Sequence, residues 1–453
     1  MHKLTRIAAL AALILLAAIA CGRPGVTAAQ APTLGGCQIL PADNLWNTPI
    51  DKLPLDSHSL EYVKNIGPNT PLHPDFGSGQ YGDYGIPFNI VPQGQAKVPI
   101  SFDYADQSDP GPYPIPTNPK IEGGSDRHIL VLEQGVCRLY ETWASSSDGH
   151  GGWNAGSGAI FDLKSNALRT DTWTSADAAG LPILPGLTRY DEVLAGAINH
   201  ALRFTAPCTA DFYIWPARHK AVPDNCPATP PAGTRVPPMG LRFRLKASVN
   251  TAGFSHDTQI ILTALKKYGM IVADNGSSWY VSGAPDTHWD DDTLVQEFKQ
   301  IHGSDFEVVD EAALQISANS GQARQQVQDS MSVAPAWGRQ GEPATYTIQI
   351  GGDGTAISLI NQLPSNVTLI DGPTTAPSGV APAMYDSATR TLSWSAAPAT
   401  MIVVNINYTV SIDTATVGAI VNTATVTRGG GPLQLSAMLI ANPLQRFLAL
   451  VRQ

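Results

Sequence analysis

The chain has 453 residues, of which 43% are hydrophobic, so it can bury large cores, and its length predicts two or three domains. Only 15% of the residues are charged, against about 25% in an average soluble domain, and the formal net charge of −10 argues against a nucleic-acid-binding surface. Glycine and proline, at 41 and 36 residues, are too few for a collagen-like or fully disordered chain, and the low charge excludes a coiled coil. This composition favours an exported, loop-rich protein that is mainly β.

The N-terminus is typical of an export signal. Lys3 and Arg6 precede an apolar run over residues 7–20, which is too short to span a bilayer comfortably. Small residues then precede Cys21, and this arrangement resembles a bacterial lipoprotein signal, in which Cys21 becomes the lipidated first residue. We expect a signal peptide over residues 1–20, a flexible tether over residues 21–36 and a lipid anchor in the cell envelope. The alternative is plain secretion after ordinary signal cleavage.

The remaining cysteines predict disulfides. Cys37, Cys137, Cys208 and Cys226 allow three pairings, and export favours their oxidation. A Cys208–Cys226 bridge would close a local loop, and a Cys37–Cys137 bridge would then attach the start of the domain to a central strand. Their spacing does not suit zinc, and we expect no metal and no cofactor.

A change in composition divides the chain. All ten histidines lie at or before His302, the last lysine is Lys299, and residues 311–453 contain only seven acids and six arginines. We expect a main domain over residues 37–310, a linker over residues 311–326 and a second domain over residues 327–428. The tail covers residues 429–453, and its last part, residues 444–453, could be a final strand, a short helix or a sorting signal.

The second domain has short alternating segments, such as residues 345–350 and 402–410, that predict a β-sandwich. The motifs GEPATYTI at 341–348, LP at 363–364 before NVT at 366–368, and VNTATV at 421–426 resemble the conserved-repeat, immunoglobulin-like domain of bacterial surface proteins. The resemblance implies a spacer, stalk or adhesive unit. Because this segment has no His, Lys or Cys, we expect no catalysis in it.

The main domain is expected to be a β-rich α+β domain. Two strand-like segments, residues 128–133 and 137–143, predict a hairpin with its turn at Gln134-Gly135. Helices are expected over residues 190–204, over residues 256–268 after a Ser255 cap, and from Asp290 or Asp291 onward.

Two groups of candidate site residues lie around this hairpin. Asp126 and His128 belong to a charged triplet at the mouth of a strand, and Glu141 shares a strand face with Trp143. A carboxylate beside a tryptophan is typical of a sugar subsite, because the ring stacks on C–H groups while the carboxylate binds hydroxyls or acts as acid or base. The glycine-rich loop that follows adds His150 and Trp153. The alternatives are a structural edge turn and a flexible hairpin loop.

Three later segments carry further candidates. A ligand could contact the loop inside the expected Cys208–Cys226 bridge, a cationic strand face suited to uronate or sulfate, and the flanks of an Asn-Gly turn. Their residues are Trp215, Arg218 and His219 in the loop, Arg242 and Arg244 with Lys246 on the strand, and Asp274 and Trp279 beside the turn. The alternatives are a surface loop without a ligand, a solvated strand face and an ordinary hairpin turn.

These residues support two hypotheses. The first is an exported carbohydrate-active enzyme acting on extracellular polysaccharide or envelope glycan. A hydrolase would pair Glu141 with Asp126, Asp177 or Asp191, and a lyase would use His128, His219, Arg242 and Arg244. The second is a non-catalytic adhesin, glycan-binding or structural surface protein. Convergence of the candidates in one deep pocket would favour catalysis, and their dispersal would favour binding or scaffolding.

Overall fold

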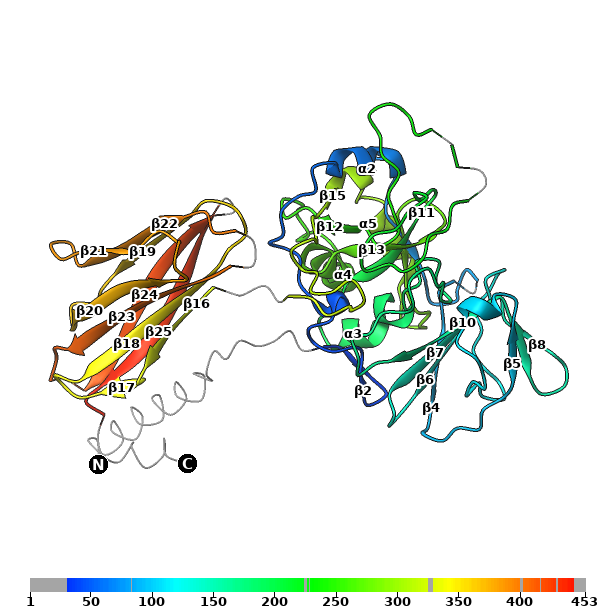
Figure 1. The fold of residues 1–453 in the computed structure, drawn as a ribbon, viewed down its shortest axis with the longest axis horizontal. Coiled ribbons are helices and arrows are strands. Elements are labelled where there is room, and N and C mark those ends of the chain that lie inside the picture. Colours follow the sequence, from blue (N-terminus) through cyan, green and yellow to red (C-terminus); the bar gives the residue numbers. More distant parts are fainter. Residues whose placement is uncertain are drawn as a thin grey trace. The chain divides into compact units, whose positions relative to one another are not determined.

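The computed structural model describes residues 31–443 except 83, 224–225, 228, 325–328, 400–401, 416 and 429–430. The expected signal peptide, Cys21 and residues 444–453 lie outside the described residues. The fold is mainly β, as expected (Figure 1). No helix in the described part of the chain is long and apolar enough to cross a membrane.

The main domain contains two larger sheets. One has the order β10-β7-β6-β4, and the other has the order β15-β12-β13-β11-β14-β3. The strands of the first are β4 (Phe88–Val91), β6 (Ile129–Glu133), β7 (Arg138–Trp143) and β10 (Ser157–Asp162). The strands of the second are β3 (His73–Asp75), β11 (Leu202–Ala206), β12 (Arg242–Leu245), β13 (Met270–Asn275), β14 (Tyr280–Ser282) and β15 (Phe306–Val308). The short strands are β1 (Thr33–Leu34), β2 (Cys37–Gln38), β5 (Ile100–Phe102), β8 (Ser146–Ser147) and β9 (Trp153–Ala155).

The expected hairpin is present, because β6 and β7 pair antiparallel from Ile129 opposite Thr142 to Glu133 opposite Arg138. The helices are α2 (Ser59–Ile66), α3 (Tyr190–Leu194), α4 (His256–Lys267) and α5 (Asp291–Phe298). The 3-10 helices are η1 (Leu45–Asn47), η2 (Ala105–Gln107), η3 (Leu184–Gly186) and η4 (Gly303–Asp305). Ser255 caps α4 by accepting the N–H of Thr258, as the sequence predicts. Helix α5 starts at Asp291, one of the two expected positions, and Asp290 caps it by accepting the N–H of Thr293.

The helix expected over residues 190–204 is present only up to Leu194, and the prediction is wrong for the residues after it. Helix α3 ends at Leu194, Gly196 adopts a φ of +90°, and Leu202–Ala206 forms strand β11. A positive φ favours glycine and interrupts a right-handed helix. Strand β11 lies between β13 and β14 in the middle of the six-stranded sheet, so tertiary pairing outweighs the helical spacing of its apolar residues.

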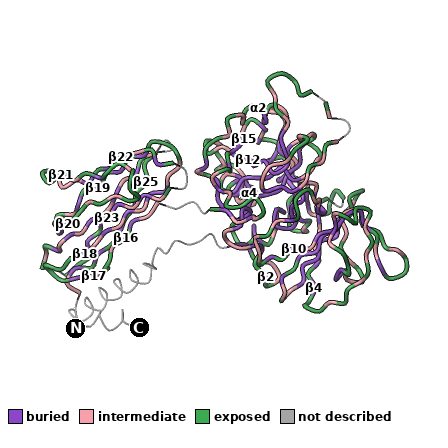
Figure 2. Tube along the Cα trace, in the orientation of Figure 1, coloured by how far each residue is buried: buried purple, intermediate pink, exposed green. Residues whose placement is uncertain are grey.

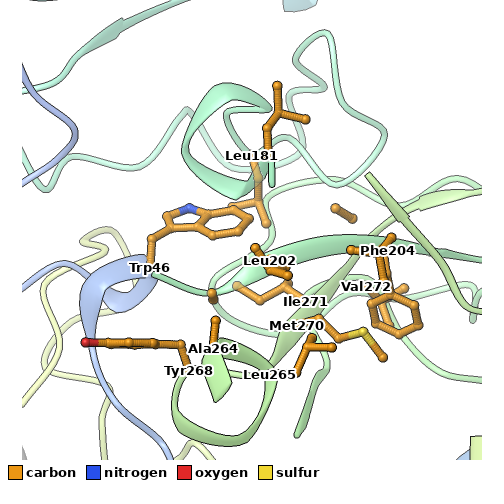
Figure 3. Close-up of a cluster of buried hydrophobic side chains, with 14 of the residues drawn as sticks. Trp46, Leu181, Leu202, Phe204, Ala264, Leu265, Tyr268, Met270, Ile271 and Val272 are labelled. Carbon is orange, nitrogen blue, oxygen red and sulfur yellow. The ribbon is translucent and has the colours of Figure 1, made fainter. Parts of the chain in front are cut away.

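One hydrophobic core joins the two larger sheets. It includes Leu130 and Leu139 from the first sheet and Phe204 and Val272 from the second. Figure 3 shows Trp46, Leu202, Met270 and Tyr268 meeting in this core, and Figure 2 shows buried segments concentrated around β12 and α4. Trp279, expected to line a cleft, lies in this core instead. It is fully buried, stacks on Phe204 and Phe306, and donates its indole N–H to the carbonyl of Gly67.

Most of the expected linker packs on the main domain. Leu314 and Ala323 are buried in its core, and Glu311 pairs with the buried Arg242 at 3.0 Å. Residues 320 and 322 form isolated β-bridges with residues 167 and 44. The segment therefore closes the main domain, because its apolar residues and one carboxylate find partners there despite its polar composition.

The C-terminal part forms a two-sheet β-sandwich, as the resemblance implied. Its sheets have the orders β16-β18-β23-β20 and β17-β25-β24-β19-β22-β21, and one core joins them. The strands are β16 (Ser330–Ala334), β17 (Trp337–Gly338), β18 (Pro343–Gly351), β19 (Ile357–Gln362), β20 (Val367–Ala376), β21 (Met384–Asp386), β22 (Thr391–Ala396), β23 (Val403–Ile412), β24 (Gly418–Arg428) and β25 (Gly431–Ala441). Strand β25 assigns the first part of the tail to the sandwich.

Both expected disulfides are present, Cys37–Cys137 and Cys208–Cys226. The first links β2 to the turn before β7, and the second closes the loop that carries Trp215, Arg218 and His219. Disulfides are typical of proteins that fold in an oxidising compartment.

Candidate functional site

A cavity of about 360 Å³ brings together four of the predicted site residues, and Asp177, named above as a possible partner in a hydrolase, lines it as well. Asp126, Trp143, His219 and Asp274 come from separate parts of the sequence and line the same cavity, which we call the pocket. Tyr104, Gln107, residues 174–178 and Asn275 complete much of its wall. A second cavity, of about 340 Å³ beside Trp46 and Trp173, is lined by none of the predicted site residues.

Two aromatic rings and a carboxylate form one side of the pocket. Trp143 ends β7 and Asp126 lies just before β6, so the hairpin pairing places them next to each other. The indole N–H of Trp143 points to Asp126 Oδ1 at 3.4 Å, a long hydrogen bond. The ring of Tyr104 lies 6.4 Å from that of Trp143, and half of the Tyr104 surface is exposed. This side therefore offers aromatic faces beside an accessible carboxylate.

A buried ion-pair network lies beneath the pocket. Arg203 on β11 donates to both oxygens of Asp177, at 3.1 and 2.8 Å, and to Asp274 at 2.9 Å. Burial lowers the pKa of Arg203, but the two carboxylates outweigh this effect and raise it. Burial, together with the charge of Asp177, raises the pKa of Asp274 although Arg203 opposes the change. One guanidinium thus holds two pocket carboxylates in place.

His128 lies behind the pocket and has partners for both ring nitrogens. Nε2 lies 3.0 Å from the carbonyl oxygen of Ala176, which can only accept, so Nε2 carries a hydrogen. Nδ1 faces Glu122 in a very short contact. Burial lowers the pKa of His128, but the bond to Glu122 and its charge raise it, and the same pairing lowers the pKa of Glu122. The pair is therefore an imidazolium and a carboxylate that position the Ala176 segment.

Glu141 faces the interior and does not line the pocket. Its carboxylate is fully buried and accepts the backbone N–H groups of Ile183 and Leu184 at 2.9–3.0 Å. Burial raises the pKa of Glu141 to about 7, although these N–H groups oppose the change. The contacts hold the start of η3 at Leu184, a few residues beyond the 174–178 wall of the pocket. Glu141 thus has the geometry of a positioning residue.

His219 reaches the pocket from the loop closed by the Cys208–Cys226 disulfide. Its Nδ1 lies 2.9 Å from the carbonyl oxygen of Ala178, which can only accept, so Nδ1 donates this hydrogen bond. In the same loop, the carbonyl of Ala221 accepts a hydrogen bond from Thr209, and Thr209 accepts one from Asn275 at 3.0 Å. The disulfide and these bonds keep the loop against the pocket.

The predicted cationic strand face has internal partners instead of facing a ligand. Arg242 is fully buried and donates to Glu311 and to the carbonyls of Leu45, Thr48 and Tyr268. Arg244 pairs with Glu307 at 2.8 Å and donates to the carbonyls of Ile50 and Leu53. Alternation correctly placed them on one side of β12, but loop segments cover that side. Neither residue lines the pocket.

The other candidates also lie outside the pocket. Arg218 is buried and donates to the carbonyls of Arg169 and Ala318, and Trp215 donates to that of Ser320. His150 is exposed in the loop between β8 and β9, and the half-buried Trp153 packs against a small core behind the first sheet. The structure therefore brings together only some of the predicted site residues.

Sequence reasoning missed three residues that shape the pocket. Arg203 lay inside the expected helix. Assigning residues 202–206 to a strand would have placed its side chain on the opposite face from those of Leu202 and Phe204. Glu122 lies in a Pro/Gly-rich loop and Tyr104 lies just before η2, and no periodicity in either segment indicates which side chains point inward. No group of three or more His, Cys, Asp or Glu in the described residues has the geometry to hold a metal ion.

No protein-family model matches the chain, and no curated protein matches it. Among solved structures, a collagen adhesin from Staphylococcus aureus is similar over 30% of this chain and 61% of its own, with 9% identity and a TM-score of 0.22. Domains D2 and D3 of the major pilin SpaD from Corynebacterium diphtheriae are similar over 25% of this chain and 51% of their own, with 10% identity and a TM-score of 0.21. A non-cellulosomal cohesin from Archaeoglobus fulgidus is similar over 28% of this chain and 100% of its own, with 12% identity and a TM-score of 0.23.

This chain thus spans about three fifths of the adhesin and half of the pilin fragment. The similarity is to part of the fold, in β-sandwich domains of surface adhesins, pilins and a cohesin. At these identities and TM-scores it does not bear on ligand or chemistry.

Proposed function

We propose that this is an exported surface protein whose main domain binds a sugar unit of an extracellular polysaccharide or envelope glycan in the pocket. The N-terminal signal pattern and the two disulfides support export. The lipid anchor at Cys21 and the spacer role of the sandwich belong to the same proposal.

The observation that carries the proposal is the meeting of Trp143, Tyr104 and Asp126 on one side of the pocket. Aromatic faces contact the C–H surface of a sugar ring, and a carboxylate accepts hydrogen bonds from its hydroxyl groups. A cavity of about 360 Å³ is within the range of small-ligand sites. Most of the deeper polar groups bond to one another, which suits a preformed binding site.

Binding is tested with the full-length protein and a panel of oligosaccharides, by isothermal titration calorimetry. For the ligand that binds best, we expect Trp143→Ala and Asp126→Asn each to weaken affinity at least about tenfold, a loss of about 1.4 kcal/mol. The matched controls are Trp153→Ala and Asp51→Asn, which remove a half-buried tryptophan and an exposed aspartate outside the pocket. If the controls weaken binding as much as the pocket variants, or if no oligosaccharide binds, the proposal fails.

A second candidate is glycoside hydrolysis in the same pocket. Asp126 is exposed, whereas Asp274 is partly buried with a raised pKa, and two carboxylates in such different environments are typical of an acid and its partner. If this candidate is correct, the protein releases new reducing ends from a polysaccharide. Asp126→Asn and Asp274→Asn should each abolish this release. The lyase alternative has less support, since Arg242 and Arg244 are held in internal ion pairs.

A further inference from the structure

We propose that the pocket selects a positively charged ligand, namely a sugar unit that carries a protonated amino group. The inference rests on the proposed glycan binding and names the chemical class of the sugar. Three observations support it: the net charge around the pocket, the excess of hydrogen-bond acceptors in it, and the aromatic rings on one side.

The charges around the pocket are mainly negative. Asp126, Asp177 and Asp274 line it, and Arg203 is the one guanidinium bonded to any of them among the described residues. Three carboxylates against one guanidinium leave two negative charges. The Glu122–His128 ion pair adds no net charge, and Asp75 at the end of β3 adds another carboxylate near Arg203 and Asp126. An anionic sugar would meet repulsion here.

The hydrogen-bonding groups favour a ligand that donates. The Arg203 guanidinium already donates to Asp177, Asp274 and Ser282, so it has little capacity left for a ligand. Among the described residues, the Asp126 carboxylate accepts only a long hydrogen bond from Trp143, so most of its acceptor capacity is open to a ligand. An ammonium group has three donors and no acceptor, which complements this set.

The aromatic side adds a second attraction for a cation. A cation over the face of a tryptophan or tyrosine is attracted by the ring quadrupole, and the attraction strengthens as water is removed. Tyr104 and Trp143 lie beside Asp126, so an ammonium group near the carboxylate also comes close to an aromatic face. The raised pKa of Asp274 is consistent with this arrangement, because an added positive charge would stabilise its ionised form.

The test compares three oligosaccharides of equal length on the full-length protein by calorimetry. They are a glucosamine oligomer, its neutral N-acetylated counterpart and an acidic galacturonate oligomer. At about pH 6.5, where a sugar amine is largely protonated, we expect the glucosamine oligomer to bind at least about tenfold more tightly than the N-acetylated one. The galacturonate oligomer should bind most weakly. The preference should shrink in high salt, since screening weakens charge attraction.

Variants assign the preference to the pocket. Asp126→Asn should reduce the preference for the amino sugar to about threefold or less, whereas Asp51→Asn, an exposed carboxylate elsewhere, should leave it intact. Equal affinity for the glucosamine and N-acetylated oligomers would overturn the charge selection while leaving the proposed function standing. A preference that Asp126→Asn does not change would also overturn it. Absence of binding to all three, and to the wider panel, would overturn the proposed function itself.

Discussion

Arg203 and Asp177 form a doubly hydrogen-bonded ion pair beneath the pocket, with Nε to Oδ2 at 3.1 Å and Nη2 to Oδ1 at 2.8 Å. The pair connects the central strand β11 to the 174–178 segment that lines the pocket. Because both side chains are almost fully buried, either charge would be left without a counterion in a low-dielectric environment if its partner were removed.

The first prediction concerns this ion pair. Arg203→Met should lower the free energy of unfolding by about 3–5 kcal/mol, because Asp177 and Asp274 would remain buried without their cation. The measurement is urea unfolding followed by circular dichroism. Lys220→Met is the matched control, since Lys220 pairs with Asp211 at the exposed surface and its loss should cost less than about 1 kcal/mol. Equal costs for the two variants would contradict the structural role of Arg203.

The second prediction concerns the pH dependence of stability. The pKa of Glu141 is about 7 in the folded protein and 4.5 ordinarily, so the folded state binds the proton more tightly between these values. The free energy of unfolding therefore falls as the pH rises through this range, by about 3 kcal/mol from this group. Glu141→Gln cannot titrate, so the stability of wild type relative to this variant should decline over the same range.

Urea unfolding at several pH values between about 4.5 and 7.5 measures this difference. Asp51→Asn serves as the control, because Asp51 is exposed and its removal should give a nearly flat difference. Glu141→Ala should also destabilise the protein by about 2–4 kcal/mol, since the N–H groups of Ile183 and Leu184 would lose their acceptor. A pH-independent difference for Glu141→Gln would show that the carboxylate is not held as described.

The third prediction separates the two disulfides. Replacing Cys37 and Cys137 by serine removes a link across 100 residues and should cost about 4–5 kcal/mol, whereas the Cys208–Cys226 link spans 18 residues and should cost about 3 kcal/mol. Ligand affinity should respond in the opposite order, because the shorter loop carries His219 to the pocket. Unfolding in urea and calorimetric titration of the same two variants measure both effects. A larger loss of affinity in the Cys37/Cys137 variant would contradict this assignment.

The fourth prediction distinguishes a core tryptophan from a pocket tryptophan. Trp279→Ala should destabilise the protein by about 3–5 kcal/mol, because the ring is fully buried between Phe204 and Phe306. Trp279→Phe should cost less and leave glycan affinity within about twofold. Trp143→Ala should show the reverse pattern, with a small loss of stability and a large loss of affinity. Weaker binding in Trp279→Phe with unchanged stability would place Trp279 at the ligand.

Much of the fold was predictable because its signals are local. The β6–β7 hairpin follows from two apolar runs around Gln134-Gly135, and α4 follows from the Ser255 cap and an apolar stripe. The sandwich follows from alternation, which β23 keeps over ten residues, from Val403 to Ile412. The β11 strand was not predictable in this way, because its pairing with β13 and β14 is non-local.

The sequence by itself determined the export-type N-terminus, the mainly β architecture, the cysteines available for two bridges and the candidate residues Asp126, Trp143, His219 and Asp274. Only the tertiary structure decided that these four meet in one pocket, and that Glu141, Arg242 and Trp279 face the interior. The physical reason is that strand alternation separates two faces without saying what covers them. Here β7 contributes Leu139 to one core and Tyr140 to another, so a polar residue on either face can be buried and bonded internally.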